Sequence, residues 1–129
     1  MSRNLDAVHE FGDRLGLDGF TLNSQGVAQL QFPGGVVLAM EIGREEMLVY
    51  TVHEVPFMPA GQWVDALKRC HVRRRGAWPI QVGCRVTPSG WEIVVLTRLS
   101  EWGLTPQRLE EAAQSVLQWR DSWFSGEAR

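Results

Sequence analysis

The chain has 129 residues, the size of one domain, and 44% of them are hydrophobic, which allows a packed core and excludes a disordered composition. Its formal net charge of −2 excludes a protein that is polycationic throughout and built to bind nucleic acid. No apolar run approaches the roughly 20 residues of a membrane-spanning helix, and no charged-then-apolar signal is present. We therefore expect a single cytoplasmic domain over residues 1–129.

The first predicted element is a helix over residues 3–16. Leu5, Val8, Phe11 and Leu15 recur at intervals of three or four, which is the spacing of one helix face. Gly16 is expected to end this helix. A short edge strand is then expected over Phe20–Leu22, followed by a turn at 23–26.

A three-stranded antiparallel meander is predicted next. Its strands are Val27–Phe32, Val36–Ile42 and Met47–Glu54, all rich in β-branched, aromatic or other apolar residues. The break at Pro33–Gly35 cannot continue a strand, because proline lacks the N–H and the glycines readily adopt positive φ. The second break, Gly43–Glu46, is polar and has the length of a hairpin turn.

The middle of this meander is apolar on both faces. The first strand alternates apolar and polar residues, whereas the second carries Leu38 and Met40 on one face and Val37 and Ala39 on the other. The third strand has Met47 and Val49 on one face and other apolar residues on the opposite one: Leu48, Tyr50 and Val52. A sheet with one solvated face should instead alternate. Either the chain covers both faces itself, or one face is covered by a partner.

The remaining elements complete an α+β pattern. Two prolines keep Val55–Pro59 extended, and a helix is expected over Ala60–His71. Strands are predicted at Ile80–Thr87 and Trp91–Leu99. A final amphipathic helix begins at Pro106 behind a capping Thr105, and a frayed tail is expected from Ser125 onward. The order is α-β-β-β-α-β-β-α, an antiparallel sheet with helices packed on it.

No residue pattern nominates a catalytic, cofactor or metal site. The three histidines are scattered, and His9-Glu10 lacks the second histidine of the zinc-binding H-E-x-x-H motif. The phosphate-binding and nucleophile-elbow motifs are absent from the sequence. The acidic pairs Glu45-Glu46 and Glu110-Glu111 read as turn and helix-surface charges. We therefore expect no enzyme activity, no cofactor and no metal.

Two alternative functions stay open on particular residues. Cys70 or Cys84 could serve a small enzyme or ligand-binding domain, although Cys70 lies on an apolar helical stripe, where an inert buried thiol is typical. The run Arg73–Arg75, close to Trp78, could contact phosphates and stack on a base in a nucleic-acid accessory protein. Arginines at a helix end are more commonly solvated or ion-paired.

The excess of apolar surface favours association instead. Six tryptophans accompany a single tyrosine, and tryptophan is favoured at buried contacts and interfaces. The stripe of Trp63, Leu67 and Cys70 on the second helix needs cover, as do the two faces of the sheet. A second copy of the chain and an extended apolar peptide would provide it.

Taken together, these features resemble the class I type III secretion chaperones, which are small cytoplasmic proteins that hold a secreted effector before export. The resemblance spans nearly the whole chain and is sharpest in Phe11-Gly12-Asp13-Arg14-Leu15-Gly16-Leu17. It also includes the Leu30 and Leu38–Ile42 strands, Pro56 after the third strand, the middle helix, the Trp91–Leu99 strand and the closing helix.

The resemblance implies a homodimer that binds the N-terminal chaperone-binding segment of an effector and keeps it soluble and competent for export. It makes Trp63, Leu67, Cys70 and Val82 dimer-interface candidates, and Phe11, Val37, Ala39, Met47 and Val49 effector-binding candidates. It implies neither catalysis nor nucleic-acid or membrane binding. The family is usually more acidic than −2, and Arg73–Arg75 is unusual for it, so a heterodimer with a related chaperone, or a partner with an acidic segment, remains an alternative.

Overall fold

The computed structural model describes residues 2–70 and 78–126 of the chain. The helices and strands follow the predicted order, and the α+β class is confirmed. Their bounds are α1 (Ser2–Arg14), β1 (Val27–Gln31), β2 (Val37–Ile42), β3 (Glu46–Val55), α2 (Ala60–Arg69), β4 (Gln81–Thr87), β5 (Gly90–Ser100) and α3 (Pro106–Ser125).

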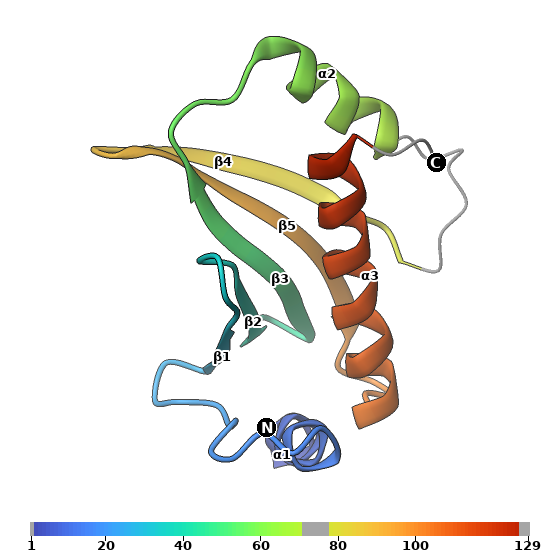
Figure 1. The fold of residues 1–129 in the computed structure, drawn as a ribbon. Coiled ribbons are helices and arrows are strands. Elements are labelled where there is room, and N and C mark those ends of the chain that lie inside the picture. Colours follow the sequence, from blue (N-terminus) through green and yellow to red (C-terminus); the bar gives the residue numbers. More distant parts are fainter. Residues whose placement is uncertain (1, 71–77, 127–129) are drawn as a thin grey trace.

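One five-stranded sheet forms the centre of the structure, with the strand order β1-β2-β3-β5-β4. Every neighbouring pair is antiparallel, so β1 and β4 are the two edge strands. Figure 1 shows α3 lying along one face of the twisted sheet, with α1 near the β1 end and α2 beyond β4. We call the side that α3 covers the helix face, and the opposite side the open face.

The core lies between α3 and the helix face of the two central strands. Alternate residues of β3 and β5 pair across this face, among them Met47 with Leu99 and Thr51 with Val95. The buried side of α3 repeats at helical spacing and is formed by Leu109, Ala112, Ala113, Val116, Trp119 and Trp123. Burial of this stripe, rather than intrinsic helix propensity, stabilises the helix.

Helix α3 begins and ends at residues suited to those positions. The Thr105 side chain accepts a hydrogen bond from the Arg108 backbone N–H at 3.1 Å, and Pro106 occupies the first helical turn, as predicted. Gly126 closes the helix in a left-handed conformation. The helix therefore includes Ser125, the first residue of the predicted frayed tail, and residues 127–129 of that tail lie outside the described part.

The predicted edge strand over Phe20–Leu22 is wrong. This segment is an irregular connection between α1 and β1 without a strand partner. Phe20 is instead buried against Phe11, with ring centroids 5.5 Å apart. The apolar side chains that suggested a strand are there because the loop must cover α1, and Gly19 takes a positive φ within it.

Gly90 provides a test of the close approach between the β4–β5 turn and the end of β3. A Cβ at Gly90 would lie 2.4 Å from the Val55 carbonyl oxygen, and the residue has a φ of +152°. Gly90→Ala should therefore destabilise the fold by about 2 kcal/mol or more in chemical denaturation. Gly83→Ala, in β4 with nothing within 4 Å of its Cβ, is the matched control and should change stability little. Equal stability of the two variants would contradict this packing.

Candidate functional site: uncovered apolar surfaces

The hairpin register separates the predicted partner-binding residues onto opposite faces of the sheet. Ile42 pairs with Met47 across the turn, so Val37 pairs with Val52 and Ala39 with Tyr50 on the open face. Met47 and Val49 belong to the helix face. Because side chains alternate with a period of two, the turn alone decides which residues of β3 join Val37. The effector-binding candidates Val37 and Ala39 therefore do not share a face with the candidates Met47 and Val49.

Burial limits these candidates further. Phe11 is 1% exposed, and Ala39, Met47 and Val49 are fully buried. They have no surface to offer a partner in this structure: Phe11, Met47 and Val49 lie in the core, and neighbouring groups cover Ala39 on the open face. Val37 is half-buried on the open face and keeps its role as a prediction.

The predicted dimer residues on α2 also divide into an inner and an outer set. Trp63 is half-buried, its ring centroid 6.4 Å from that of Trp91 and 5.9 Å from that of Trp123. The Trp123 indole N–H donates to the Gln62 carbonyl at 3.0 Å, which anchors α2 to α3. Leu67, by contrast, points outward with 74% of its surface exposed. The tryptophan cluster thus holds α2 in place and leaves Leu67 free for a partner.

Strand β4 lies beyond β5 as an open edge. Val82, Cys84 and Val86 lie on its helix face, opposite Val95, Ile93 and Trp91 of β5. Val82 is half-buried, Cys84 is exposed and Val86 is 69% exposed. Together with the outward residues of α2 they form what we call the α2–β4 surface: Val64, Leu67, Val82 and Val86. No strand of the described residues pairs with the outer edge of β4, and such an edge is a template for pairing with another chain.

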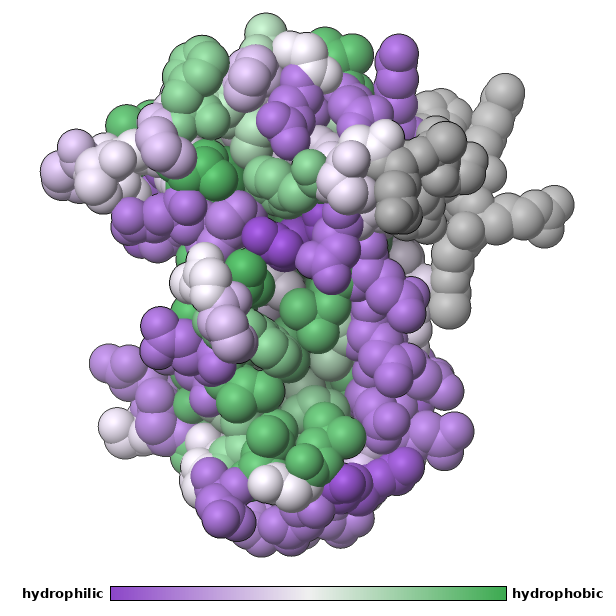
Figure 2. Space-filling view, viewed as in Figure 1, coloured by the Kyte–Doolittle hydropathy of each residue, from purple (hydrophilic) through white to green (hydrophobic). Residues whose placement is uncertain are grey.

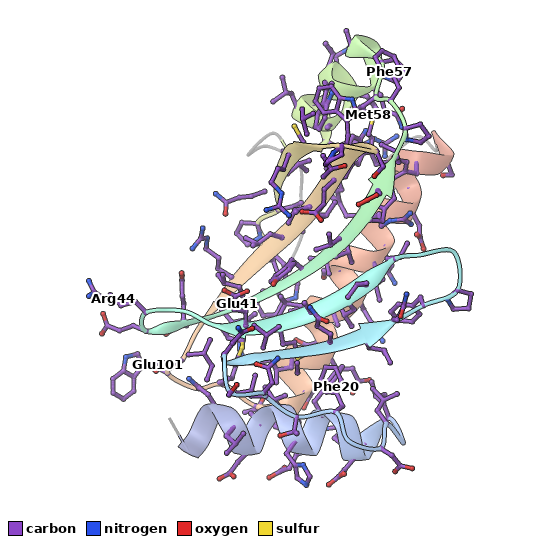
Figure 3. All side chains as sticks on the ribbon, turned by 90° about the vertical axis from the view of Figure 1, so that its left-hand side faces the viewer. Phe20, Glu41, Arg44, Phe57, Met58 and Glu101 are labelled. Carbon is purple, nitrogen blue, oxygen red and sulfur yellow. The ribbon has the colours of Figure 1, made fainter. Side chains whose placement is uncertain are left out.

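The open face forms a second uncovered surface. Figure 3 looks onto it, with α3 behind the sheet and α1 and α2 at its margins. Its centre consists of half-buried apolar side chains, which are Val37, Leu48, Val52, Val94 and Leu96. Polar pairs lie around this centre, including Arg98–Glu46 and Arg85–Glu92, both at 2.6 Å. The Tyr50 hydroxyl donates to Glu41 at 2.7 Å, and burial together with this carboxylate raises the pKa of Tyr50.

The third surface is a hollow on the helix side. Figure 2 shows an apolar band between α3 and the β1–β2 hairpin, rising from α1 toward α2. Leu30 and Phe32 are half-buried, and Leu30 pairs with Leu38 on the helix face. On α3, Leu117 and Phe124 are half-buried and, with Arg120, lie at the three- and four-residue spacing of one helix side. The half-buried apolar residues of the elements that border this band are Leu30 and Phe32 of the β1–β2 hairpin and Leu117 and Phe124 of α3, and we call the band the α3 groove.

A polar pair lies at the α2 end of the α3 groove. The Arg120 Nε–H donates to His53 Nδ1 at 3.5 Å, and the His53 ring meets Phe124 edge-on at 4.7 Å. Burial, followed by the charge of Arg120, lowers the pKa of His53 to about 4, so the ring is neutral at pH 7. Neither Arg120 nor Phe124 was assigned a site role from the sequence. The sequence did contain a signal for this pair. Ala113, Leu117, Arg120 and Phe124 follow one another at helical spacing, so a cation lies within an otherwise apolar row.

The alternative sites gain little from the structure. Burial raises the pKa of Cys70, which disfavours the reactive thiolate, while Cys84 is exposed on β4. The Arg73–Arg75 run lies outside the described residues. Within residues 2–70 and 78–126 there is no cluster of three His, Cys, Asp or Glu side chains suited to a metal ion. Over the same residues, no helix is both long and apolar enough to span a membrane.

Comparison with known proteins reveals similarity of fold. No protein-family model and no curated protein matches the sequence. Among solved structures, a chain of the ExsC–ExsE complex aligns with a TM-score of 0.69 and 18% identity, over 95% of this chain and 91% of that one. The Yersinia pestis type III secretion chaperone SycH, solved with a fragment of YscM2, gives 0.65 and 15%, over 94% and 97%. A chain of the HopA1–SchA chaperone–effector complex gives 0.65 and 13%, over 94% and 92%.

The same fold is more widely distributed than these complexes. YbjN of E. coli, a putative transcription regulator, aligns with a TM-score of 0.53 and 19% identity, over 91% of this chain and 83% of that one. Fold alone does not determine function. The resemblance predicted from the sequence is confirmed as a likeness of architecture: the chain has the fold of the type III secretion chaperone SycH.

The neutral, buried His53 makes stability depend on pH in a defined direction. Its pKa is about 4 in the folded chain and ordinarily 6.5, so the unfolded state binds the proton more readily between these values. The contribution of His53 is complete above pH 6.5 and is lost as the pH falls toward 4, by roughly 1–2 kcal/mol after allowance for solvent near the ring. Urea unfolding of wild type and His53→Gln should show this difference in slope. Identical pH profiles would contradict it.

Proposed function

We propose that this protein is a cytoplasmic type III secretion chaperone that binds the N-terminal chaperone-binding segment of a secreted effector. The fold is that of proteins solved as chaperone complexes, and it leaves the α3 groove and the open face uncovered by its own helices. The uncovered α3 groove is the observation that carries the proposal. Its length and apolar lining suit an unfolded segment better than a small polar substrate.

The mechanism is burial rather than chemistry. An aggregation-prone segment lays its apolar side chains between Leu30 and Phe32 on one side and Leu117 and Phe124 on the other. If about 1,000 Å² of apolar surface is buried, the gross gain is ~25 kcal/mol, most of it offset by ordering the segment and by association entropy. The net affinity is therefore moderate, which holds the effector soluble yet releasable. This function requires neither a cofactor nor a catalytic residue.

The α2–β4 surface serves the homodimer in this proposal. Leu67, Val64 and Val86 are exposed large apolar side chains of α2 and β4. Trp63 and Cys70 support the interface from within, and Val82 contributes the inner end of the β4 row. Pairing with a related chaperone through the same surface is the heterodimeric alternative.

The proposed docking site is tested by co-expression with a secreted protein encoded beside this chain. Phe32→Glu places a charge in the α3 groove and should abolish co-purification, because the carboxylate must be desolvated on binding. Val94→Glu makes the same chemical change on the open face and should retain the partner. Circular dichroism and thermal melting check that both variants fold. The assignment of the groove fails if Val94→Glu alone loses the partner, or if deletion of the partner's N-terminal region leaves binding intact.

The dimer is tested by light scattering. Wild type should give twice the 14.6 kDa of the chain, and Leu67→Glu should give a monomer because the interface would bury an unpaired charge. Leu15→Glu, at an exposed leucine on the segment after α1, is the matched control and should stay dimeric. A monomeric wild type, or a dimeric Leu67→Glu variant, would refute this interface.

A further inference from the structure

Arg120 is a largely buried cation beside the α3 groove. Its side chain is 16% exposed, and its guanidinium carbon lies 5.0 Å from the centre of the Phe124 ring. Nε donates to His53 Nδ1 at 3.5 Å, a long hydrogen bond, and Nη1 pairs with Asp121 Oδ1 at 2.8 Å. His53 and Phe124 thus hold the guanidinium at the α2 end of the groove.

Within residues 2–70 and 78–126, the positive charge of Arg120 is only partly compensated. His53 is a neutral acceptor and contributes no negative charge. The Asp121 carboxylate is 71% exposed, and an ion pair at so solvated a position contributes little. A guanidinium has five N–H donors, and no other protein group within residues 2–70 and 78–126 accepts a hydrogen bond from it. Several donors therefore remain available beside apolar surface.

A second arginine, Arg69, shows how this chain supplies its own hydrogen-bond acceptors to a buried cation. Arg69 has a side chain 5% exposed, and its Nε donates to Asp65 at 2.9 Å while Nη1 donates to Ser122 at 2.8 Å. Arg69 joins α2 to α3 and is a structural cation. Arg120 has the burial of such a residue without its set of acceptors.

We propose that Arg120 selects partner segments that carry an aspartate or glutamate at the α2 end of their apolar run. The inference rests on the proposed function of the α3 groove. It adds that the segment bound there carries a negative charge at one position. A carboxylate matches the planar guanidinium and can accept two parallel hydrogen bonds from it. The desolvation of Arg120 is already largely complete in the free protein, so the new ion pair adds affinity as well as register.

The test starts with the full-length protein and a phage-displayed library of random linear peptides. Wild type should select apolar peptides with Asp or Glu enriched at one fixed distance from the apolar residues. Arg120→Gln should select apolar peptides without this enrichment. Arg108→Gln is the matched control, since Arg108 lies in the first turn of α3 and stacks on Trp78, away from His53 and Phe124. It removes the same charge from the same helix and should select as wild type does.

Affinities of one selected peptide and its Asp→Asn version complete the test. The Asn peptide should bind wild type roughly ten-fold or more weakly, and Arg120→Gln should bind both peptides equally. Arg120→Glu should recover binding of the Asp→Lys peptide, a result that a merely structural arginine would not produce. Arg120→Lys, which retains the charge without the fork, should bind the Asp peptide with intermediate affinity.

The possible results separate this inference from the proposed function. Apolar peptides that compete at the groove without acidic enrichment would overturn the role of Arg120 and leave the groove assignment standing. Acidic enrichment that persists in Arg120→Gln would overturn it as well. Failure of wild type to select any peptide whose binding Phe32→Glu abolishes would refute the groove itself, and the inference with it.

Discussion

The packing of one helix on a five-stranded sheet governs the whole surface of this protein. A helix with its side chains is about 10–12 Å wide, whereas five strands spaced about 4.8 Å apart span roughly 19 Å. α3 buries its apolar side mainly over β3 and β5, the two central strands. It cannot also cover the β1–β2 hairpin and the β4 edge. The α3 groove and the α2–β4 surface are what this mismatch leaves uncovered.

Both ends of α3 are anchored by neighbouring helices. Near its start, Arg14 of α1 lies 3.5 Å from Glu110. At its other end Trp123 contacts Gln62, and Ser122 accepts from Arg69 of α2. The helix is thereby held at both ends, while Leu117 between them is half-buried. In the proposed binding mode, a helix held at both ends acts as a preorganised side of the site, which lowers the entropy lost when a segment docks.

In the binding mode proposed for this protein, a buried charge supplies specificity. Hydrophobic burial supplies affinity but discriminates poorly among apolar segments. A cation such as Arg120 discriminates because a segment without a carboxylate leaves it unpaired, while a wrongly placed positive charge is repelled. Since the same fold also occurs in YbjN, differences in such side chains, and not the fold, distinguish the functions that this architecture supports.

Local sequence was sufficient for the order of the elements and for most of their bounds. Several signals act only through residues that are neighbours in the sequence, so they could be recognised without the fold. They are the alternation of Ala28 and Leu30 with glutamines, the Pro33–Gly35 break and the Thr105-Pro106 start of α3. The α+β class follows from them. The excess of apolar surface was likewise evident from composition and patterning.

The tertiary structure alone decided which of those apolar residues face outward. Met47 and Val49 lie on the opposite face of the sheet from Val37, and this depends on the strand register across one turn. The burial of Phe20 depends on α1, and the division between Trp63 and Leu67 depends on contacts with Trp91 and Trp123, distant in sequence. The position of Arg120 beside His53 of β3 was evident only from the tertiary structure. Hydrophobic pattern specifies that a residue is to be buried, whereas long-range packing specifies against what.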